Sequence, residues 1–185
     1  MEKLNLVKPT IEYEQQAYEY IQEFKKYNSN ISGSGALDEY EGRYNEYLEL
    51  LEKCRTNPPK KWVKSETFML IRESDNKLIG MINIRLNLNE VLLERGGHIG
   101  YSVRPTERRK GYNSYQLYKA LEYCKENGLE KVLITCNKEN IASAKSIQKY
   151  GGILENEVLE EETNEVVQRY WINLNKVLKK KKSGY

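Results

Sequence analysis

The sequence predicts an α/β protein of the layered α+β kind, with a mixed, mostly antiparallel sheet of about six to seven strands and helices on both faces. Short apolar or alternating segments, typical of strands, are interleaved with longer segments whose apolar residues recur at helical spacing. A chain of 185 residues with 39% hydrophobic content is also long enough for one domain with a sizeable core and short for two.

The first part of the chain predicts one strand and two helices. Pro9 and Thr10 mark a helix start after the strand, and a run of small residues separates the two helices. Pro58 and Pro59 then close the second helix. The expected elements are a strand over residues 4–7, helices over 11–27 and 38–54, and a flexible connector over 29–35.

The remainder predicts six strands and two helices. The turn-forming tripeptide 74–76 makes a hairpin of the first two of these strands. We expect one domain over residues 1–178 and a basic, flexible tail over 179–185, because the lysine run lies beyond the last apolar segment. The expected strands cover 66–73, 77–86, 97–103, 131–136, 153–159 and 166–172, and the helices begin near 111 and 140.

Composition excludes several classes of protein. The formal net charge is only +3, so we expect no general attraction to nucleic acid or to an anionic membrane. No apolar run approaches the length of a membrane span. The three cysteines are widely spaced and only one histidine is present, so we expect neither a disulfide framework nor a metal site. A cytoplasmic location fits this cysteine usage best.

Residues 103–113 join a predicted strand to a predicted helix through a basic loop. The first turn of a helix leaves N–H groups unpaired and carries a partial positive charge, so an anion there gains hydrogen bonds and dipole attraction. Gly111 lets the backbone approach a ligand closely, and the charges of residues 108–110 suit a diphosphate. The loop therefore predicts a phosphate cradle, and a solvated basic turn is the alternative.

The loop resembles the acyl-CoA pyrophosphate motif of the GNAT superfamily of N-acyltransferases, written Gln/Arg-x-x-Gly-x-Gly/Ala. Arg108 and Gly111 match this motif, whereas Asn113 departs from its last position. Downstream, the strand near 132–137, the Asn140-x-x-Ser143 helix start and the Gly-Gly helix end resemble the next motif of the family. Helix capping is the alternative role of Asn140 and Ser143.

The resemblance implies a GNAT-like N-acetyltransferase that uses acetyl-CoA and no metal. In that family the fourth and fifth strands splay apart to admit the acyl-pantetheine, and backbone N–H near Val103 polarises the thioester oxygen. The acceptor implied is a primary amine of a small molecule or peptide, and a homodimer is one open assembly state. The implied cofactor site comprises Ser102, Val103, Arg108, Arg109, Lys110, Gly111, Tyr112, Asn113, Asn140 and Ser143.

The acid for the departing thiolate is not in its usual place. Many relatives carry a tyrosine four residues before the Gly that ends the second motif, and this position is Ile147. Tyr150 lies three positions further along the helix, on a different side, so the role does not transfer to it. Tyr101 is the candidate that we name instead, and the alternatives are water or departure of the thiolate without a dedicated acid.

The candidate base is His98, the only histidine, at the start of the strand that would hold the cofactor. A structural role for His98 and a solvated Glu94 as the rival base are the alternatives. The idiosyncratic segments 28–37 and 86–95 are expected to select the acceptor. A non-catalytic acyl-CoA-binding module is the competing function, because the missing tyrosine would also fit lost chemistry.

Overall fold

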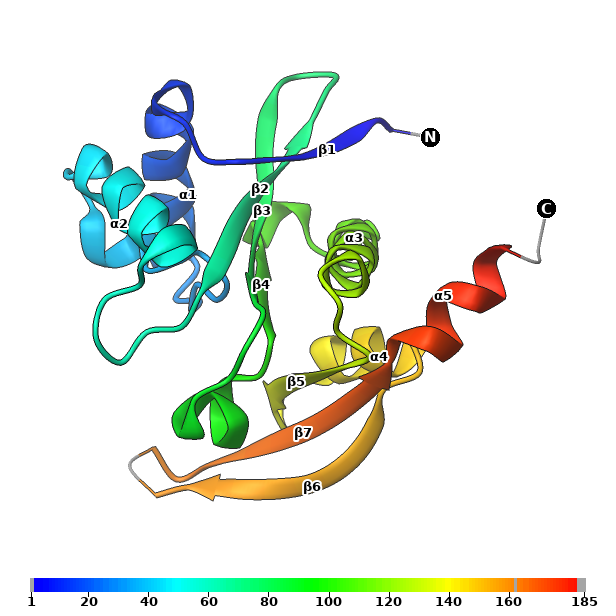
Figure 1. The fold of residues 1–185 in the computed structure, drawn as a ribbon. Helices are drawn as coiled ribbons and strands as arrows, with labels where there is room; N and C mark the ends of the chain where they lie inside the picture. The colour runs from blue at the N-terminus through cyan, green and yellow to red at the C-terminus, as the bar shows by residue number, and fades with distance from the viewer. Residues whose placement is uncertain (1, 162, 183–185) are drawn as a thin grey trace.

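The computed structural model describes residues 2–161 and 163–182. Its described strands form two antiparallel sheets, one with the order β1-β2-β3-β4 and one with the order β5-β7-β6 (Figure 1). The α/β architecture with seven strands is therefore confirmed, but the strands divide into two sheets where a single mixed sheet was expected. The strands are Leu4–Val7, Ser65–Arg72, Lys77–Arg85, Ile99–Val103, Lys131–Asn137, Ile153–Glu160 and Glu165–Asn173.

Five α-helices and four short helical turns complete the described part of the chain. The second helix starts later than expected, because residues 37–40 form a separate turn. The α-helices are α1 (Glu14–Lys26), α2 (Tyr44–Thr56), α3 (Tyr112–Glu126), α4 (Ile141–Lys149) and α5 (Leu174–Lys182). The short turns are η1 (Ile11–Tyr13), η2 (Leu37–Tyr40), η3 (Leu92–Gly96) and η4 (Pro105–Glu107).

Helix α5 was not expected from the sequence. The Asn173 side chain accepts a hydrogen bond from the Lys176 N–H at its start, and Leu174 is fully buried. The lysine run to residue 182 continues this helix, where a flexible tail was expected from residue 179. Residues 183–185 of that expected tail lie outside the described residues.

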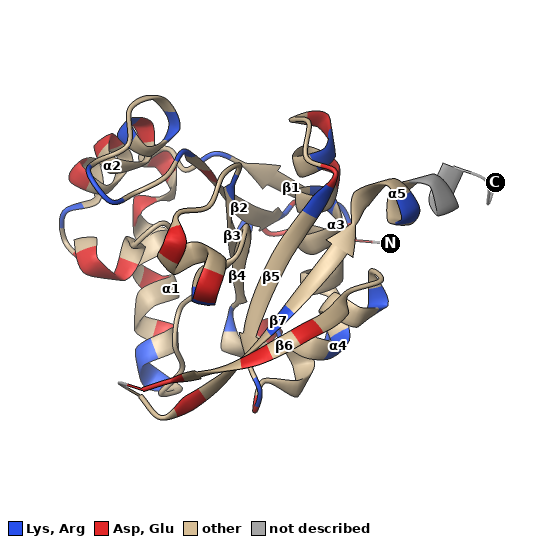
Figure 2. Cartoon of the chain, turned by 60° about the horizontal axis from the view of Figure 1, so that its bottom comes forward, with Lys and Arg blue, Asp and Glu red and all other residues tan. Residues whose placement is uncertain are grey.

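Successive side chains of β3 belong to different core clusters, so the first sheet lies between two layers of helices. Met81 belongs to a core cluster shared with α1 and α2, whereas Ile82 and Ile84 pack into the cluster that contains Leu117 and Leu121 of α3. Successive side chains of a strand point to opposite faces, so a strand buried on both sides reads as a continuous apolar run. Charged residues of both signs are distributed along the helices, strands and loops (Figure 2).

Strands β4 and β5 part at the junction of the two sheets. Their ends are tied at one point, where the His98 N–H donates to the Leu133 carbonyl over 2.7 Å. Beyond this point the two strands belong to separate sheets. β4 is thus an edge strand of the first sheet and β5 an edge strand of the second, with α3 against the first sheet and α4 against the second (Figure 1).

Candidate functional site

A groove of about 2240 Å³ runs through the opening between the sheets. Residues 99–103 of β4 and 135–137 of β5 line it, and so do the loop before α3 and one face of α4. Residues 28–36 and 89–92 also line it. Both segments that were expected to select an acceptor thus reach the groove, and the first of them contacts the basic loop, because Arg108 Nη2 donates to the Ser29 hydroxyl over 2.7 Å.

The basic loop leads into α3 through a left-handed turn. Gly111 is the residue before the helix and has φ +88°, a conformation that L side chains rarely adopt. A side chain at this position would point into open space, so the first turn of α3 is accessible from the groove. Arg108 and Arg109 are exposed and line the groove beside this turn. The turn therefore has the geometry and charge of an anion site.

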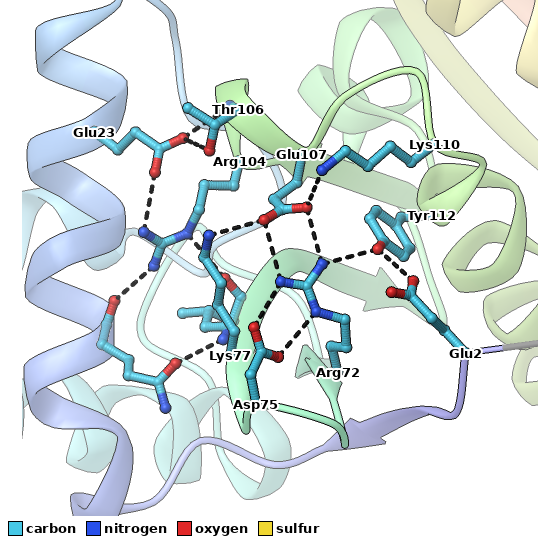
Figure 3. Close-up of polar contacts among 12 residues, drawn as sticks. Glu2, Glu23, Arg72, Asp75, Lys77, Arg104, Thr106, Glu107, Lys110 and Tyr112 are labelled. Carbon is cyan, nitrogen blue, oxygen red and sulfur yellow. Dashed lines mark hydrogen bonds and ion pairs between the residues drawn. The ribbon is translucent and has the colours of Figure 1, made fainter.

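Lys110, which was expected to contact the cofactor, forms an ion pair within the protein. Its ammonium group lies 2.8 Å from Glu107, a carboxylate that also receives Arg72 and Lys77 (Figure 3). These three cations hold the pKa of Glu107 at about 2, against the desolvation that would raise it. Lys110 thus anchors the loop to the first sheet.

Most contacts of the Tyr112 side chain are with the protein core rather than with the groove. It is 5% exposed, packs in the core with Leu70 and Ile79, and exchanges hydrogen bonds with Arg72 and Glu2. Although Tyr112 lines part of the groove, its hydroxyl is directed to Arg72 and Glu2 (Figure 3).

The end of β4 is fixed by hydrogen bonds from three sides. The Ser102 hydroxyl accepts from Tyr20 over 3.0 Å and donates to the Ser32 carbonyl. The Val103 carbonyl accepts from Arg108 Nε over 3.1 Å. Ser102 and Val103 are buried and line the groove. The end of β4 is therefore a well-packed wall beside the first turn of α3.

Helix α4 contributes a cap and a hydroxyl. The Asn140 side chain accepts from the Ser143 N–H over 3.1 Å, which is the capping role. The Ser143 hydroxyl lies 2.7 Å from the Tyr101 hydroxyl of β4, and Asn113 hydrogen-bonds to the same phenol. Burial raises the pKa of Tyr101 to about 12, so this phenol is protonated at neutral pH. The cluster of Tyr101, Asn113 and Ser143 faces the groove.

Asn113, the residue that departs from the family motif, also accepts from Gln116 Nε2 over 3.0 Å. Gln116 donates in addition to the Ser102 carbonyl over 3.3 Å, and its own Oε1 is buried without a partner. The side chain at 113 therefore connects the first turn of α3 to β4 and to Tyr101.

His98 is held as a structural residue. Its side chain is buried, its Nδ1 accepts from the Leu133 N–H over 2.9 Å, and its ring packs edge-on against Trp171. Burial lowers the pKa of His98 to about 4, and the charge of Arg85 acts in the same direction. His98 is not among the described residues that line the groove. These contacts favour a structural role over catalysis.

The other candidates for proton transfer lie outside the groove. Ile147 is fully buried in the main core, and Tyr150 donates to the Ser114 carbonyl over 2.7 Å on the α3 side. Glu94 is an exposed carboxylate 4.0 Å from Arg95. Among the sequence candidates, Tyr101 is the one that the structure brings into the groove.

Sequence reasoning missed two polar residues on the groove wall, Asn83 and Arg85 of β3. The signal was present, because these two residues interrupt an otherwise apolar strand at a spacing of two, which places them on one face. Within the described residues no group of three or more His, Cys, Asp or Glu side chains is arranged to hold a metal ion. None of the described helices combines the length and apolar character that crossing a bilayer requires.

Comparison with known sequences gives two matches. The family described as "Acetyltransferase (GNAT) family" matches residues 14–151. The uncharacterized N-acetyltransferase YnaD of Bacillus subtilis strain 168 is 34% identical over 88 residues. That alignment covers 47% of this chain and 49% of YnaD, so it spans about half the length of the relative.

Comparison with solved structures shows the same fold at low identity. A mutant form of the spermidine/spermine N-acetyltransferase SpeG from Vibrio cholerae has a TM-score of 0.66 and 19% identity, covering 96% of this chain and 98% of its own. The microcin C7 self-immunity acetyltransferase MccE, solved with acetyl-CoA and AMP, has a TM-score of 0.69 and 14% identity. Its alignment covers 94% of this chain and 93% of MccE.

Proposed function

The chain belongs to the GNAT family of acetyltransferases, and from this premise we propose that it transfers the acetyl group of acetyl-CoA to a primary amine. The observation that carries the proposal is the first turn of α3, which opens onto the groove beside Arg108 and Arg109. Its N–H groups and the two guanidinium groups suit the pyrophosphate of the cofactor. The open space at Gly111 leaves room for it.

The rest of the cofactor would lie along β4. Backbone groups near Val103 and the side chains of Asn140 and Ser143 line the groove beyond the anion site. The buried hydrogen bonds of Ser102 keep this strand end in place, so the thioester would meet a fixed set of donors.

Transfer in a ternary complex needs one bond to form and one to break. The neutral amine attacks the thioester carbonyl carbon, the C–N bond forms, and the C–S bond breaks without a covalent enzyme intermediate. The amine gives up its proton to solvent in the groove, the departing sulfur takes a proton from the Tyr101 hydroxyl, and the Tyr101 phenolate regains a proton from solvent. Tyr101 suits this role because it is protonated at neutral pH and is oriented by Ser143.

Ile147 supports one alternative, a module that binds acyl-CoA without turnover. Its fully buried side chain supplies no hydroxyl where many relatives carry a tyrosine. Under this alternative Tyr101 serves only to tie β4 to α4.

Calorimetric titration with acetyl-CoA, followed by thiol release over a panel of amines, tests the proposal. We expect binding and amine-dependent release of coenzyme A. Binding with no release across polyamines, amino acids, peptides and aminoglycosides would support the non-catalytic module. Absence of binding would contradict both functions.

A further inference from the structure

The guanidinium group of Arg85, in the groove, has no counter-ion among the described residues. Arg85 lies at the end of β3, lines the groove, and is only partly exposed. Its Nη1 donates to the carbonyls of Gly96 and Gly97 over 3.2 and 3.1 Å. Within the described residues it forms no ion pair, in contrast to Arg72, Arg95, Arg104 and Arg169.

An unpaired guanidinium in such a place is costly. A charge removed from water is normally compensated by an opposite charge as well as by hydrogen bonds. Burial accordingly lowers the pKa of Arg85, with no carboxylate acting against this effect. Because Arg85 lines the groove, an anion in the groove can reach its guanidinium group.

The surrounding floor of the groove is polar as well. Asn83 is two residues before Arg85 on the same face of β3, and Ser65 is the cross-strand neighbour of Arg85 on β2. All three residues line the groove. One position earlier on this face is Met81, which packs under α1 and α2, so the change from apolar to polar coincides with the start of the groove.

The short distance between Arg85 and β4 limits how far apart the anionic group and the amine of an acceptor can be. Arg85 Nη2 lies 3.6 Å from the point where a Cβ of Gly100 would be, so the guanidinium is adjacent to the second residue of the strand along which the cofactor would lie. A ligand that places its anion at Arg85 therefore presents an amine to β4 only if the two groups are a short distance apart. Three carboxylates also line the groove, and their charge attracts an ammonium group. They are Asp38 and Glu39 of η2 and Glu90, just before η3.

We propose that Arg85 binds the carboxylate of the acceptor, and that the acceptor is an amino acid or a similarly small amino-carboxylate. This inference rests on the proposed acetyl transfer and specifies its substrate class. The planar fork of arginine matches a carboxylate with two parallel hydrogen bonds. The cation disfavours polyamines, which carry no anionic group.

The test compares each amino acid with its own carboxamide as acceptor. We expect the best acceptor to be an amino acid that is preferred over its amide by at least about tenfold in kcat/KM, a difference typical of one charge-assisted pair. Arg85→Gln should reduce this ratio by about tenfold, the whole of the expected contribution of Arg85. The ratio is internal to each variant, so a partly folded preparation does not distort it.

Arg169→Gln is the matched control, because Arg169 also holds the η3 loop, donating to the Leu93 carbonyl over 3.2 and 2.9 Å. Arg169 is not among the described groove-lining residues. This control should keep the acid-to-amide ratio. An equal loss in both variants would show that Arg85 only supports the loop and would overturn the inference.

Calorimetry of the same amino acids with the coenzyme A-bound protein gives a readout that is independent of turnover. Failure of every amino acid to bind, or a best substrate without a carboxylate, would overturn the role of Arg85. Failure of acetyl-CoA itself to bind would instead contradict the proposed function.

Discussion

The Tyr101 hydroxyl lies 2.7 Å from the Ser143 hydroxyl, so β4 and α4 meet at this point across the opening between the two sheets. The position on α4 at which many relatives place a tyrosine is the buried Ile147 in this chain. A phenol from β4 thus reaches the same helix from the opposite wall of the groove. This arrangement makes Tyr101 the side chain to test first.

Tyr101→Phe should lower kcat by about 100-fold, a common contribution of one general acid, with little change in the affinity for acetyl-CoA. The ring remains to fill its site, so the loss is confined to the hydroxyl. Tyr150→Phe is the control, because its hydroxyl binds the Ser114 carbonyl on the α3 side. Steady-state kinetics with both variants decides the question, and equal kcat values for Tyr101→Phe and wild type would remove Tyr101 from the mechanism.

Gly111→Asp should weaken acetyl-CoA binding more than Gly111→Asn does. Both side chains meet the same φ of +88° and the same open space, so the strain that they cause is matched. The aspartate adds a negative charge at the site of the pyrophosphate, which should raise Kd by about tenfold relative to the asparagine variant. Calorimetry measures both constants. Identical constants would mean that the phosphates bind elsewhere.

Local chemistry is what made much of the fold predictable. The tripeptide 74–76 specified a hairpin, and Gly111 with the charges beside it specified a loop that opens a helix, because turn geometry is encoded within a few residues. The division into two sheets was not predictable in this way. It depends on where β4 and β5 stop pairing, which is fixed by contacts such as that of His98 with Leu133, 35 positions apart.

For the candidate site too, features set by neighbouring residues were predictable, whereas contacts between residues distant in sequence were not. The place of the basic loop between a strand and a helix is confirmed, but the pairing of Lys110 with Glu107 was missed, although these residues are three apart. The deciding partners, Arg72 and Lys77, come from the hairpin and are distant in sequence. Arg85 was missed because a charged residue at a strand end is ordinarily solvated, although its spacing of two from Asn83 places both residues on one face of the strand.

Glu107→Gln should lower the free energy of unfolding by roughly 3 kcal/mol at pH 7, the usual cost of breaking a buried ion pair. The folded pKa of Glu107 is about 2, below its ordinary value of 4.5. Its contribution is therefore complete above pH 4.5 and is lost as the pH falls towards 2. Urea denaturation at pH 7 and at pH 3 should show a smaller difference between variant and wild type at the lower pH.

Glu46→Gln is the control for this comparison, because Glu46 forms an exposed pair with Arg43 and should change stability by less than about 1 kcal/mol. A pH-independent difference for Glu107→Gln would contradict the electrostatic explanation. The same variant should raise the KM for acetyl-CoA, since Lys110 loses the anchor of the loop.

His98→Asn and His98→Leu separate a structural histidine from a catalytic base. Asparagine carries an oxygen near the position of Nδ1, so it can still accept from the Leu133 N–H, whereas leucine leaves this buried donor unpaired at a cost of about 1–3 kcal/mol. We expect kcat to stay within about twofold of wild type for His98→Asn, because an amide cannot act as a base at neutral pH and none is needed at this position. A large loss of kcat in both variants would restore His98 as the base.

The pH dependence of stability gives an independent test of His98. Its folded pKa of about 4 lies below the ordinary 6.5, so the unfolded chain binds the proton more tightly. The free energy of unfolding of the wild type should therefore fall as the pH drops from 6.5 towards 4. His98→Asn removes the titrating group, so the variant should lose less stability than the wild type over this interval. Parallel curves from urea titrations would show that His98 is accessible to protons in the folded protein, contrary to its buried contact with Leu133.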